Sequence, residues 1–294
     1  MNDENCKTWL EVAVNGPWGR ERQPRIPIAL DEIVAEAVEC AKAGAAIIHL
    51  HPYDVATGRQ KHDPDVTAQI ITAIRAQCDA IVYPALPFVH EGSAPERYAQ
   101  VEELARRGLL EWAAVDPGSC NIALYDDLRE DRNGFVYANP EEHLRHVLGL
   151  ARRHRSHPAY AIYEPGFMRL GASLHWRCSC PAPIYRLMFS SGFTFGFPPE
   201  DYGLTAYLNL LDQVAPGAQW MLSGLAVDVL PLIPRAVAEG GHVRVGLEDA
   251  PFGSTRSNLE WVKMAVDAIG DAGGELASPA HVRATMRAVE MGER

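Results

Sequence analysis

Residues 45–51 read Ala45-Ala46-Ile47-Ile48-His49-Leu50-His51, an apolar run that ends in two histidines separated by one residue. A short apolar run of this kind is typical of a buried strand, and side chains two positions apart on a strand point to the same side. Both imidazoles can therefore reach one object, and a metal ion is the natural candidate because imidazole is a common zinc ligand. The alternative is a pair of buried, hydrogen-bonded histidines, which is the better interpretation for either one alone.

A second stretch, far downstream, offers a carboxylate for the same ion. It reads Val243-Arg244-Val245-Gly246-Leu247-Glu248-Asp249, again at the end of an apolar run. Two imidazoles and one carboxylate leave zinc an open position, so Glu248 is the predicted third ligand. Asp249 is the candidate general base, and Arg244 either grips a substrate carboxylate or holds Asp249 in position. The alternatives are an acidic pair that is solvated or caps a helix, and a structural salt bridge made by Arg244 between strands.

Apolar runs alternate with amphipathic segments along the whole chain. Strands are predicted near residues 9–14, 45–50, 80–83, 112–115, 159–163, 187–190, 219–222 and 243–247. Helices are predicted near 31–43, 64–77, 94–107, 140–153, 199–214, 226–239, 257–271 and 279–289, with a shorter helical stretch after Pro165-Gly166. Eight continuous apolar strands with interleaved helices predict a single (β/α)8 TIM barrel, an α/β domain over residues 1–294 with a C-terminal helix. A doubly wound open sheet is the alternative.

In such a barrel the active site lies at the C-terminal ends of the strands. The two histidines end the second predicted strand and the Glu-Asp pair follows the eighth, and both strands flank the first. The loops after the first and fourth strands offer polar groups from Asn15, Gly118 and Ser119 as substrate contacts, although such turns also occur in ordinary loops. Ser119 is the strongest of these candidates, because the glycine before it lets the backbone come close.

Composition excludes several classes of protein. The 294 residues, 47% of them hydrophobic, can bury a large core, and 27 basic against 38 acidic residues give a net charge of -11. That charge argues against a broad nucleic-acid footprint and against attraction to anionic membranes. No apolar stretch approaches the roughly 20 residues that span a bilayer, and Met1–Asn5 lacks a signal-peptide pattern. We expect a cytoplasmic protein whose six cysteines are reduced.

The two motifs resemble those of a known family, the β-keto acid cleavage enzymes, which includes 3-keto-5-aminohexanoate cleavage enzyme. The resemblance runs from Val12-Ala13-Val14-Asn15-Gly16 to Ala277-Ser278-Pro279 and is most specific in residues 43–51 and 240–249. It implies a zinc-dependent (β/α)8 barrel that condenses a β-keto acid with acetyl-CoA, giving acetoacetate and a new acyl-CoA. It also implies a homo-oligomer, a dimer or a tetramer.

The resemblance extends to individual residues. By similarity His49, His51 and Glu248 match the zinc ligands, Asp249 the catalytic carboxylate, Arg244 its partner arginine and Ser119 a substrate-contacting hydroxyl. Trp18, however, stands where the aminohexanoate enzyme has an acidic residue suited to an amine, so the substrate is predicted not to bear one.

Other departures concern the acyl-CoA half of the reaction. Tyr53 replaces an arginine, Pro84-Ala85-Leu86-Pro87 replaces a Ser/Thr-Gly-Gly turn, Gly224-Leu225-Ala226-Val227 lacks a Gly-Arg pair, and Ala250 replaces an asparagine. Two alternatives therefore stay open. One is a zinc-dependent carbon-carbon lyase or hydrolase on the same barrel without a CoA step, and the other is a binding barrel without turnover.

Overall fold

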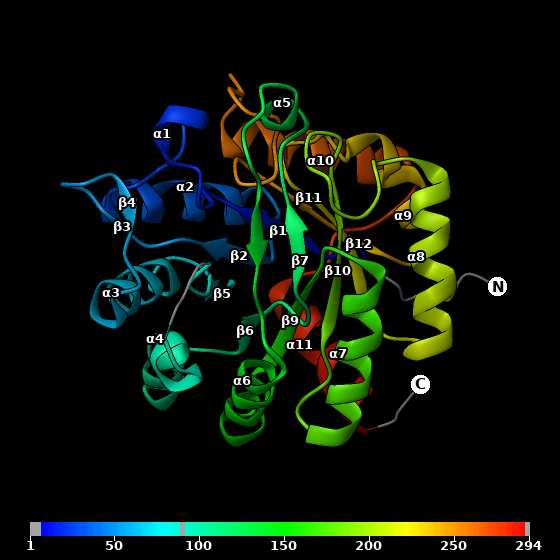
Figure 1. Cartoon of the computed structure of the whole chain (residues 1–294), viewed down its shortest axis with the longest axis horizontal. Coiled ribbons are helices and arrows are strands. Elements are labelled where there is room, and N and C mark those ends of the chain that lie inside the picture. The colour runs from blue at the N-terminus through cyan, green and yellow to red at the C-terminus, as the bar shows by residue number, and fades with distance from the viewer. Residues whose placement is uncertain (1–6, 89–91, 292–294) are drawn as a thin grey trace.

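The chain forms a barrel of eight parallel strands, seen in a computed structural model that describes residues 7–88 and 92–291 (Figure 1). The segment Met1–Asn5 and Cys6 lie outside these ranges. The barrel strands are β1 (Leu10–Ala13), β2 (Ile47–Leu50), β5 (Ile81–Pro84), β6 (Trp112–Val115), β9 (His157–Ile162), β10 (Ile184–Phe189), β11 (Trp220–Gly224) and β12 (His242–Val245).

The strands follow one another around the barrel in chain order. Neighbours pair in the order β5-β2-β1-β12-β11-β10-β9-β6, and every pair is parallel. β5 and β6 pack side by side where the two ends of this sheet meet, so the barrel is nearly closed. This order confirms the (β/α)8 barrel and excludes the doubly wound sheet, in which the strand order reverses at a switch point.

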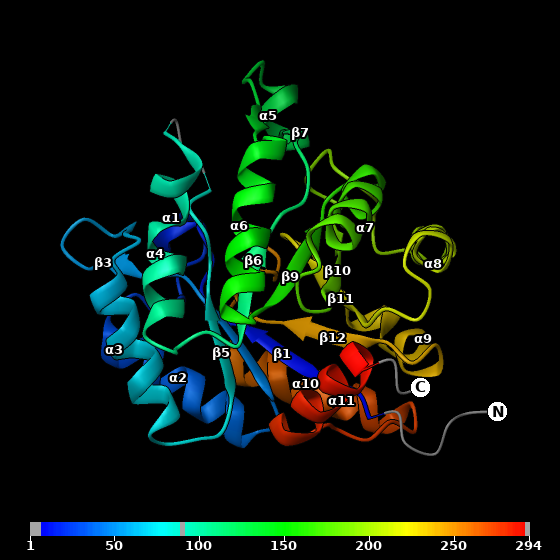
Figure 2. The same cartoon turned by 90° about the horizontal axis from the view of Figure 1, so that it is seen from below.

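Helices cover the outside of the barrel (Figure 2). They are α2 (Leu30–Lys42), α3 (Pro64–Arg75), α4 (Ala94–Arg106), α6 (Glu141–His154), α7 (Pro165–Cys178), α8 (Asp201–Val214), α9 (Ile233–Ala238), α10 (Asn258–Asp271) and α11 (Pro279–Met291). Their starts follow local sequence signals. Asp63 caps α3 by accepting hydrogen bonds from the backbone of Asp65 and Val66, and Ser257 caps α10. None of the helices in the described ranges combines the length and apolar character needed to cross a membrane.

Two helices differ from the prediction. The helix predicted from residue 226 begins only at Ile233, after a 3-10 turn, η1 (Leu230–Leu232). Pro231 and Pro234 have no N–H to donate, and Ala226 has a φ of 53°, so the segment cannot continue one α-helix back to residue 226. The stretch after Pro165-Gly166, predicted to be short, is instead the 14-residue helix α7, which buries Phe167, Met168 and Leu174 against the barrel.

Short elements in the loops after the strands were not predicted. They are the hairpin β3 (Tyr53–Asp54) and β4 (Arg59–Gln60), the hairpin β7 (Cys120–Ile122) and β8 (Phe135–Tyr137), and the helices α1 (Gly19–Arg22) and α5 (Tyr125–Arg129). The segment around α5 projects from one end of the molecule (Figure 2). Because the two hairpins follow β2 and β6, they add walls at the C-terminal ends of the barrel strands.

The opposite end of the barrel is closed by α11. Arg283 on this helix forms ion pairs with Asp79 at 2.8 Å and, through a hydrogen bond of 3.0 Å, with Glu111, both in loops that lead into barrel strands. Inside that end, the rings of Trp9 and His242 stack with centroids 3.9 Å apart. The N-terminal end of the barrel is therefore packed and paired within the protein itself.

Candidate active site

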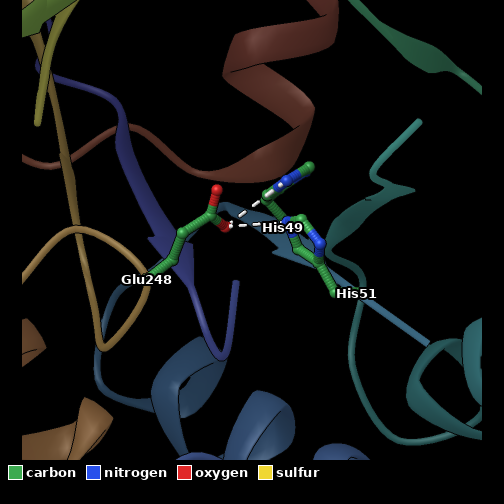
Figure 3. A group of neighbouring side chains, drawn as sticks. All are labelled: His49, His51 and Glu248. Carbon is green, nitrogen blue, oxygen red and sulfur yellow. Dashed lines mark ion pairs between the residues drawn. The ribbon is translucent and has the colours of Figure 1, made fainter. Parts of the chain in front are cut away.

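Three side chains converge at the C-terminal ends of β2 and β12 (Figure 3). His49 lies in β2, His51 directly follows it, and Glu248 lies in the loop after β12. Glu248 Oε2 is 3.5 Å from His49 Nε2 and 3.3 Å from His51 Nε2, and the possible ligand atoms all lie within 4.8 Å of one another. All three residues are buried. The two motifs therefore meet at one rim of the barrel, as the strand order predicts.

The hydrogen bonds around His51 show that this group fits a metal ion. Its Nδ1 lies 2.6 Å from Gln60 Oε1, which can only accept, so Nδ1 carries a proton, and Nε2 presents a lone pair when the ring holds no second proton. That lone pair faces Glu248 Oε2, and among the described residues neither atom has a hydrogen-bond partner. Two buried acceptors that face each other need a cation between them. Two imidazoles and a carboxylate are a donor set that suits zinc.

Arg244 joins the three-residue cluster to Asp249. Its Nη2 lies 2.9 Å from Glu248 Oε1 and 2.7 Å from Asp249 Oδ1, and its Nε donates to Asp249 Oδ2 at 3.0 Å. Its Nη1 lies 3.4 Å from Glu11 Oε1 inside the barrel. Of the alternatives open from the sequence, the geometry supports the one in which Arg244 fixes the orientation of Asp249, because a two-point contact between a guanidinium and a carboxylate sets the angle as well as the distance.

Burial and neighbouring charges set the protonation of these groups. Burial lowers the pKa of His49 well below its usual range, which keeps the imidazole neutral and able to bind a metal. Although burial opposes ionisation of Glu248, the Arg244 guanidinium holds the pKa of its carboxyl well below the usual range. Burial raises the pKa of Asp249, with Arg244 opposing the shift. The two adjacent carboxylates thus differ: Glu248 stays charged, whereas Asp249 is closer to exchanging a proton.

Asn15 lies beneath the site and holds His51 in place. Its Nδ2 donates to the carbonyl of His51 at 2.8 Å, and its Oδ1 accepts from the N–H of His51 at 2.8 Å. The side chain is fully buried and also donates to the carbonyl of Pro27. The next residue, Gly16, has a φ of +77°, and a Cβ there would come within 2.6 Å of the Glu248 side chain. Asn15, predicted as a substrate contact, thus contacts the backbone of the candidate ligand His51.

Gly118 and Ser119 lie apart from the metal-ligand cluster. The exposed Ser119 accepts a hydrogen bond through Oγ from the N–H of Asn139 at 2.7 Å, and the carbonyl of Gly118 accepts from Asn139 Nδ2 at 2.8 Å. Gly118 packs against Phe167, whose ring would lie 2.3 Å from an added Cβ. Neither residue lines the pocket above His49 and His51, so the structure does not bring these two predicted substrate contacts together with the others.

The pocket contains three polar side chains that sequence reasoning did not assign to the site: Asp116 after β6, Tyr137 on β8 and Arg186 on β10. The Tyr137 hydroxyl makes a short hydrogen bond to Asp116 Oδ2. The remaining walls are mostly apolar and comprise Pro17, Trp18, Ala85, Leu86, Phe88, Ala114, Ala161, Tyr163, Met188 and Leu225. Arg186 had a visible signal, since it is the charged residue within the apolar strand Ile184-Tyr185-Arg186-Leu187-Met188-Phe189. Gln60 and Tyr137 had none, because both act from hairpins that were not predicted.

Comparisons with known proteins show the family of the chain. The family model described as "beta-keto acid cleavage enzyme" matches residues 7–287. The chain is 24% identical to 3-dehydrocarnitine:acetyl-CoA trimethylamine transferase from Rhizobium meliloti, over 96% of this chain and 97% of that protein. It is 25% identical to 3-keto-5-aminohexanoate cleavage enzyme from Fusobacterium nucleatum, over 90% and 91% respectively.

Among solved structures, the fold is similar to that of ObcA without ligand. The TM-score is 0.69 at 16% identity, with 90% of this chain and 65% of that chain covered. That likeness shows the fold alone. The family match covers nearly the whole chain and includes both motifs that build the His-His-Glu cluster, so this protein belongs to the β-keto acid cleavage enzyme family.

Proposed function

We propose that this protein is a zinc-dependent β-keto acid cleavage enzyme that condenses a β-keto acid with acetyl-CoA and releases acetoacetate and a new acyl-CoA. The observation that carries the proposal is the buried His49-His51-Glu248 cluster with Asp249 held beside it by Arg244, at the rim where TIM barrels perform catalysis. Acetyl-CoA as co-substrate is supported by family membership and by its place in the name of the Rhizobium relative.

Each residue of the cluster has a part in this proposal. His49, His51 and Glu248 would hold the zinc ion, which when bound supplies a Lewis acid for a substrate carbonyl. Asp249 takes a proton from a carbon next to a carbonyl group and returns one later, a role that suits a carboxylate whose pKa is raised by burial. Arg244 holds Asp249 at the angle needed for that transfer. Asn15 and Gln60 act as positioning residues, because they fix the backbone and the ring of His51.

The pocket also supports a substrate without an amine. Trp18 lines it, donates its indole N–H to the carbonyl of Glu248 at 2.8 Å and stacks on Phe193. It therefore offers an apolar face and no negative charge to the substrate. Arg186, on the pocket wall, adds positive charge that would repel an ammonium group.

The test is an assay of zinc-loaded enzyme with a panel of β-keto acids in the presence of acetyl-CoA. Acetoacetate and the matching acyl-CoA should form in equal amounts, which mass spectrometry measures directly. If no member of the panel gives an acyl-CoA product, the transferase proposal is rejected.

A second candidate is a zinc-dependent carbon-carbon lyase or hydrolase without a CoA step. It is motivated by the four departures Pro84, Ala85, Val227 and Ala250. Ala85 lines the pocket without a polar group, and Val227 uses its N–H on the carbonyl of Asp249. Product formation at an unchanged rate without acetyl-CoA would establish this alternative. A metal-binding barrel without turnover would instead bind zinc and be inactive under both conditions.

Assembly and location remain expectations of the same proposal. We expect a homo-oligomer, which light scattering on the purified protein tests, and a cytoplasmic location, where acetyl-CoA is available.

A further inference from the structure

Arg186 is a buried cation whose hydrogen-bonding capacity is largely unused. It is 3% exposed and extends from β10 into the pocket that contains the His-His-Glu cluster. Its Nη2 donates to the carbonyl of Ala159 at 2.9 Å, whereas its buried Nε has no hydrogen-bond partner in the described part of the chain. Asp116 Oδ1 lies 3.9 Å from Nη2, which allows attraction but is too long for a hydrogen bond. A buried guanidinium with an unused donor is costly unless a ligand completes it.

The contrast with Arg244 shows what Arg186 lacks. Arg244 lies in the same pocket and contacts the carboxylates of Glu11, Glu248 and Asp249, two of them closer than 3.0 Å. Its charge is thus balanced by the protein. Within residues 7–88 and 92–291, Arg186 has one carboxylate within ion-pair range and none within hydrogen-bonding distance. Of these two arginines, Arg186 is the one that can still accept a carboxylate as a hydrogen-bonded partner.

Arg186 enters the pocket from the strand opposite the one that carries His49. In the cyclic order of strands, β10 lies four steps from β2 in either direction, so Arg186 reaches in from the wall opposite His49. Ala114 and Ala161, on the two strands that precede β10, also line the pocket and leave space beside the guanidinium. A substrate whose keto acid end lies at the candidate metal ligands can therefore extend its other end toward Arg186.

We propose that Arg186 binds a second anionic group of the substrate, and hence that the substrate is a β-keto dicarboxylic acid with its distal carboxylate at Arg186. This inference rests on the proposed function for the keto acid end of the molecule. A guanidinium suits the role because it presents donors in a planar fork that matches a carboxylate. The ring of Tyr83, 5.9 Å from the guanidinium carbon, supports the cation from another side.

Asp116 does not prevent a second carboxylate from binding. Its Oδ2 is occupied by the Tyr137 hydroxyl, and burial favours its uncharged form. Arg244 also shows that one guanidinium in this barrel can serve more than one carboxylate.

Two probes of equal chain length test the proposal. 3-Oxoadipate carries the distal carboxylate, and 3-oxohexanoate has a methyl group in its place. With zinc-loaded enzyme and acetyl-CoA, we expect kcat/KM to be at least about tenfold higher for 3-oxoadipate, as one charge-assisted contact provides. In Arg186→Met, the ratio of kcat/KM for 3-oxoadipate to that for 3-oxohexanoate should fall about tenfold or more, because the KM for 3-oxoadipate rises. In Arg186→Lys, part of the wild-type ratio should be retained. A ratio near one in the wild type, or a ratio unchanged in Arg186→Met, would overturn the proposal.

A matched control variant distinguishes loss of substrate recognition from the general effect of removing a buried arginine on the fold. Arg97 on α4 is also buried, and like Arg186 it has one guanidinium nitrogen, Nη2, without a hydrogen-bond partner in the described part of the chain. It donates to the carbonyls of Pro87 and Ala138 and does not line the pocket, so it shares the buried, partly unpaired cation but not the place in the site. Arg97→Met should lower the melting temperature and leave the ratio unchanged. If Arg97→Met changes the ratio as much as Arg186→Met, the effect comes from the fold and the proposal is wrong.

Calorimetric binding without acetyl-CoA distinguishes this inference from the proposed function. Tighter binding of 3-oxoadipate than of 3-oxohexanoate that is lost in Arg186→Met would establish the anion subsite even if neither compound is converted. Conversion of both compounds with equal efficiency and equal affinity would support the transferase and reject the subsite.

Discussion

Two buried histidines, His242 and His51, lie at opposite ends of the barrel. Each has one ring nitrogen on a glutamine oxygen, but the second ring nitrogen meets a backbone N–H in His242 and a carboxylate in His51. His242, at the start of β12, has its Nε2 2.9 Å from Gln219 Oε1, and its Nδ1 accepts from the backbone N–H of Trp9 at 3.2 Å. His51, just after β2, also has one nitrogen bound to a glutamine oxygen, but its other nitrogen faces a carboxylate. The protein completes the imidazole of His242, whereas that of His51 still requires a cation.

This difference separates a structural histidine from a candidate metal ligand. Burial does not distinguish them, because His242 is 1% and His51 6% exposed. The distinction lies in whether the protein supplies a donor to the second ring nitrogen. Each of the following predictions tests this contrast between the two ends of the barrel.

Loss of a candidate ligand should have the largest effect. We expect His49→Ala and Glu248→Ala each to lose stoichiometric zinc and to lower kcat/KM by about 1000-fold or more, because the metal contributes several kcal/mol. His242→Gln is the control at the other end and should keep its zinc. Metal analysis and steady-state kinetics measure the two quantities. Full zinc content in both ligand variants would refute the metal site.

Zinc should also stabilise the folded state. At a free zinc concentration of 100 times Kd, the free energy of unfolding should rise by about 2.7 kcal/mol. Chelation should therefore lower the melting temperature of the wild type and of His242→Gln, and leave that of His49→Ala unchanged. Equal melting temperatures of the wild type with and without chelator would contradict the site.

The two glutamines form a matched pair of variants. Gln60→Leu removes the acceptor that sets the tautomer of His51, so zinc affinity should weaken by about tenfold to a hundredfold. Gln219→Leu removes the equivalent acceptor from His242 and should leave zinc affinity unchanged. A competition titration with a zinc chelator measures both. Equal affinities in the two variants would show that Gln60 has no special part.

The smallest expected effect is the acid sensitivity of the closed end. Burial lowers the pKa of His242 from 6.5 to about 3, so the unfolded state takes up the proton first. The stability from this residue is present above pH 6.5 and is lost as the pH falls toward 3, by about 1 kcal/mol between pH 6.5 and 5.5. Denaturant unfolding at pH 6.5 and 5.5 should show that the free energy of unfolding falls less in His242→Gln than in the wild type. If the free energy of unfolding falls equally with pH in both proteins, a group other than His242 is responsible for the acid sensitivity.

The barrel was predictable because its signal is local and repeated. Each of the eight strands lies at or within a few residues of its predicted range, since parallel strands covered on both faces are continuous apolar runs. The helix predicted from 226 failed because Pro231 lies in the 3-10 turn and Pro234 in the first turn of α9, and neither has an N–H for a bond to a preceding helical turn. The two hairpins, of two or three residues per strand, are too short for periodicity to reveal.

By itself, the sequence determined that two imidazoles and a carboxylate would meet at one rim. The histidines are two residues apart at the end of β2, and both β2 and β12, the strand that precedes Glu248, are neighbours of β1. Only the tertiary structure decided which partners these groups have. Gln60, Asn15 and Arg186 obtain their roles from hydrogen bonds made, or left unmade, between segments distant along the chain, and such contacts depend on distances of a few ångströms that no local pattern encodes.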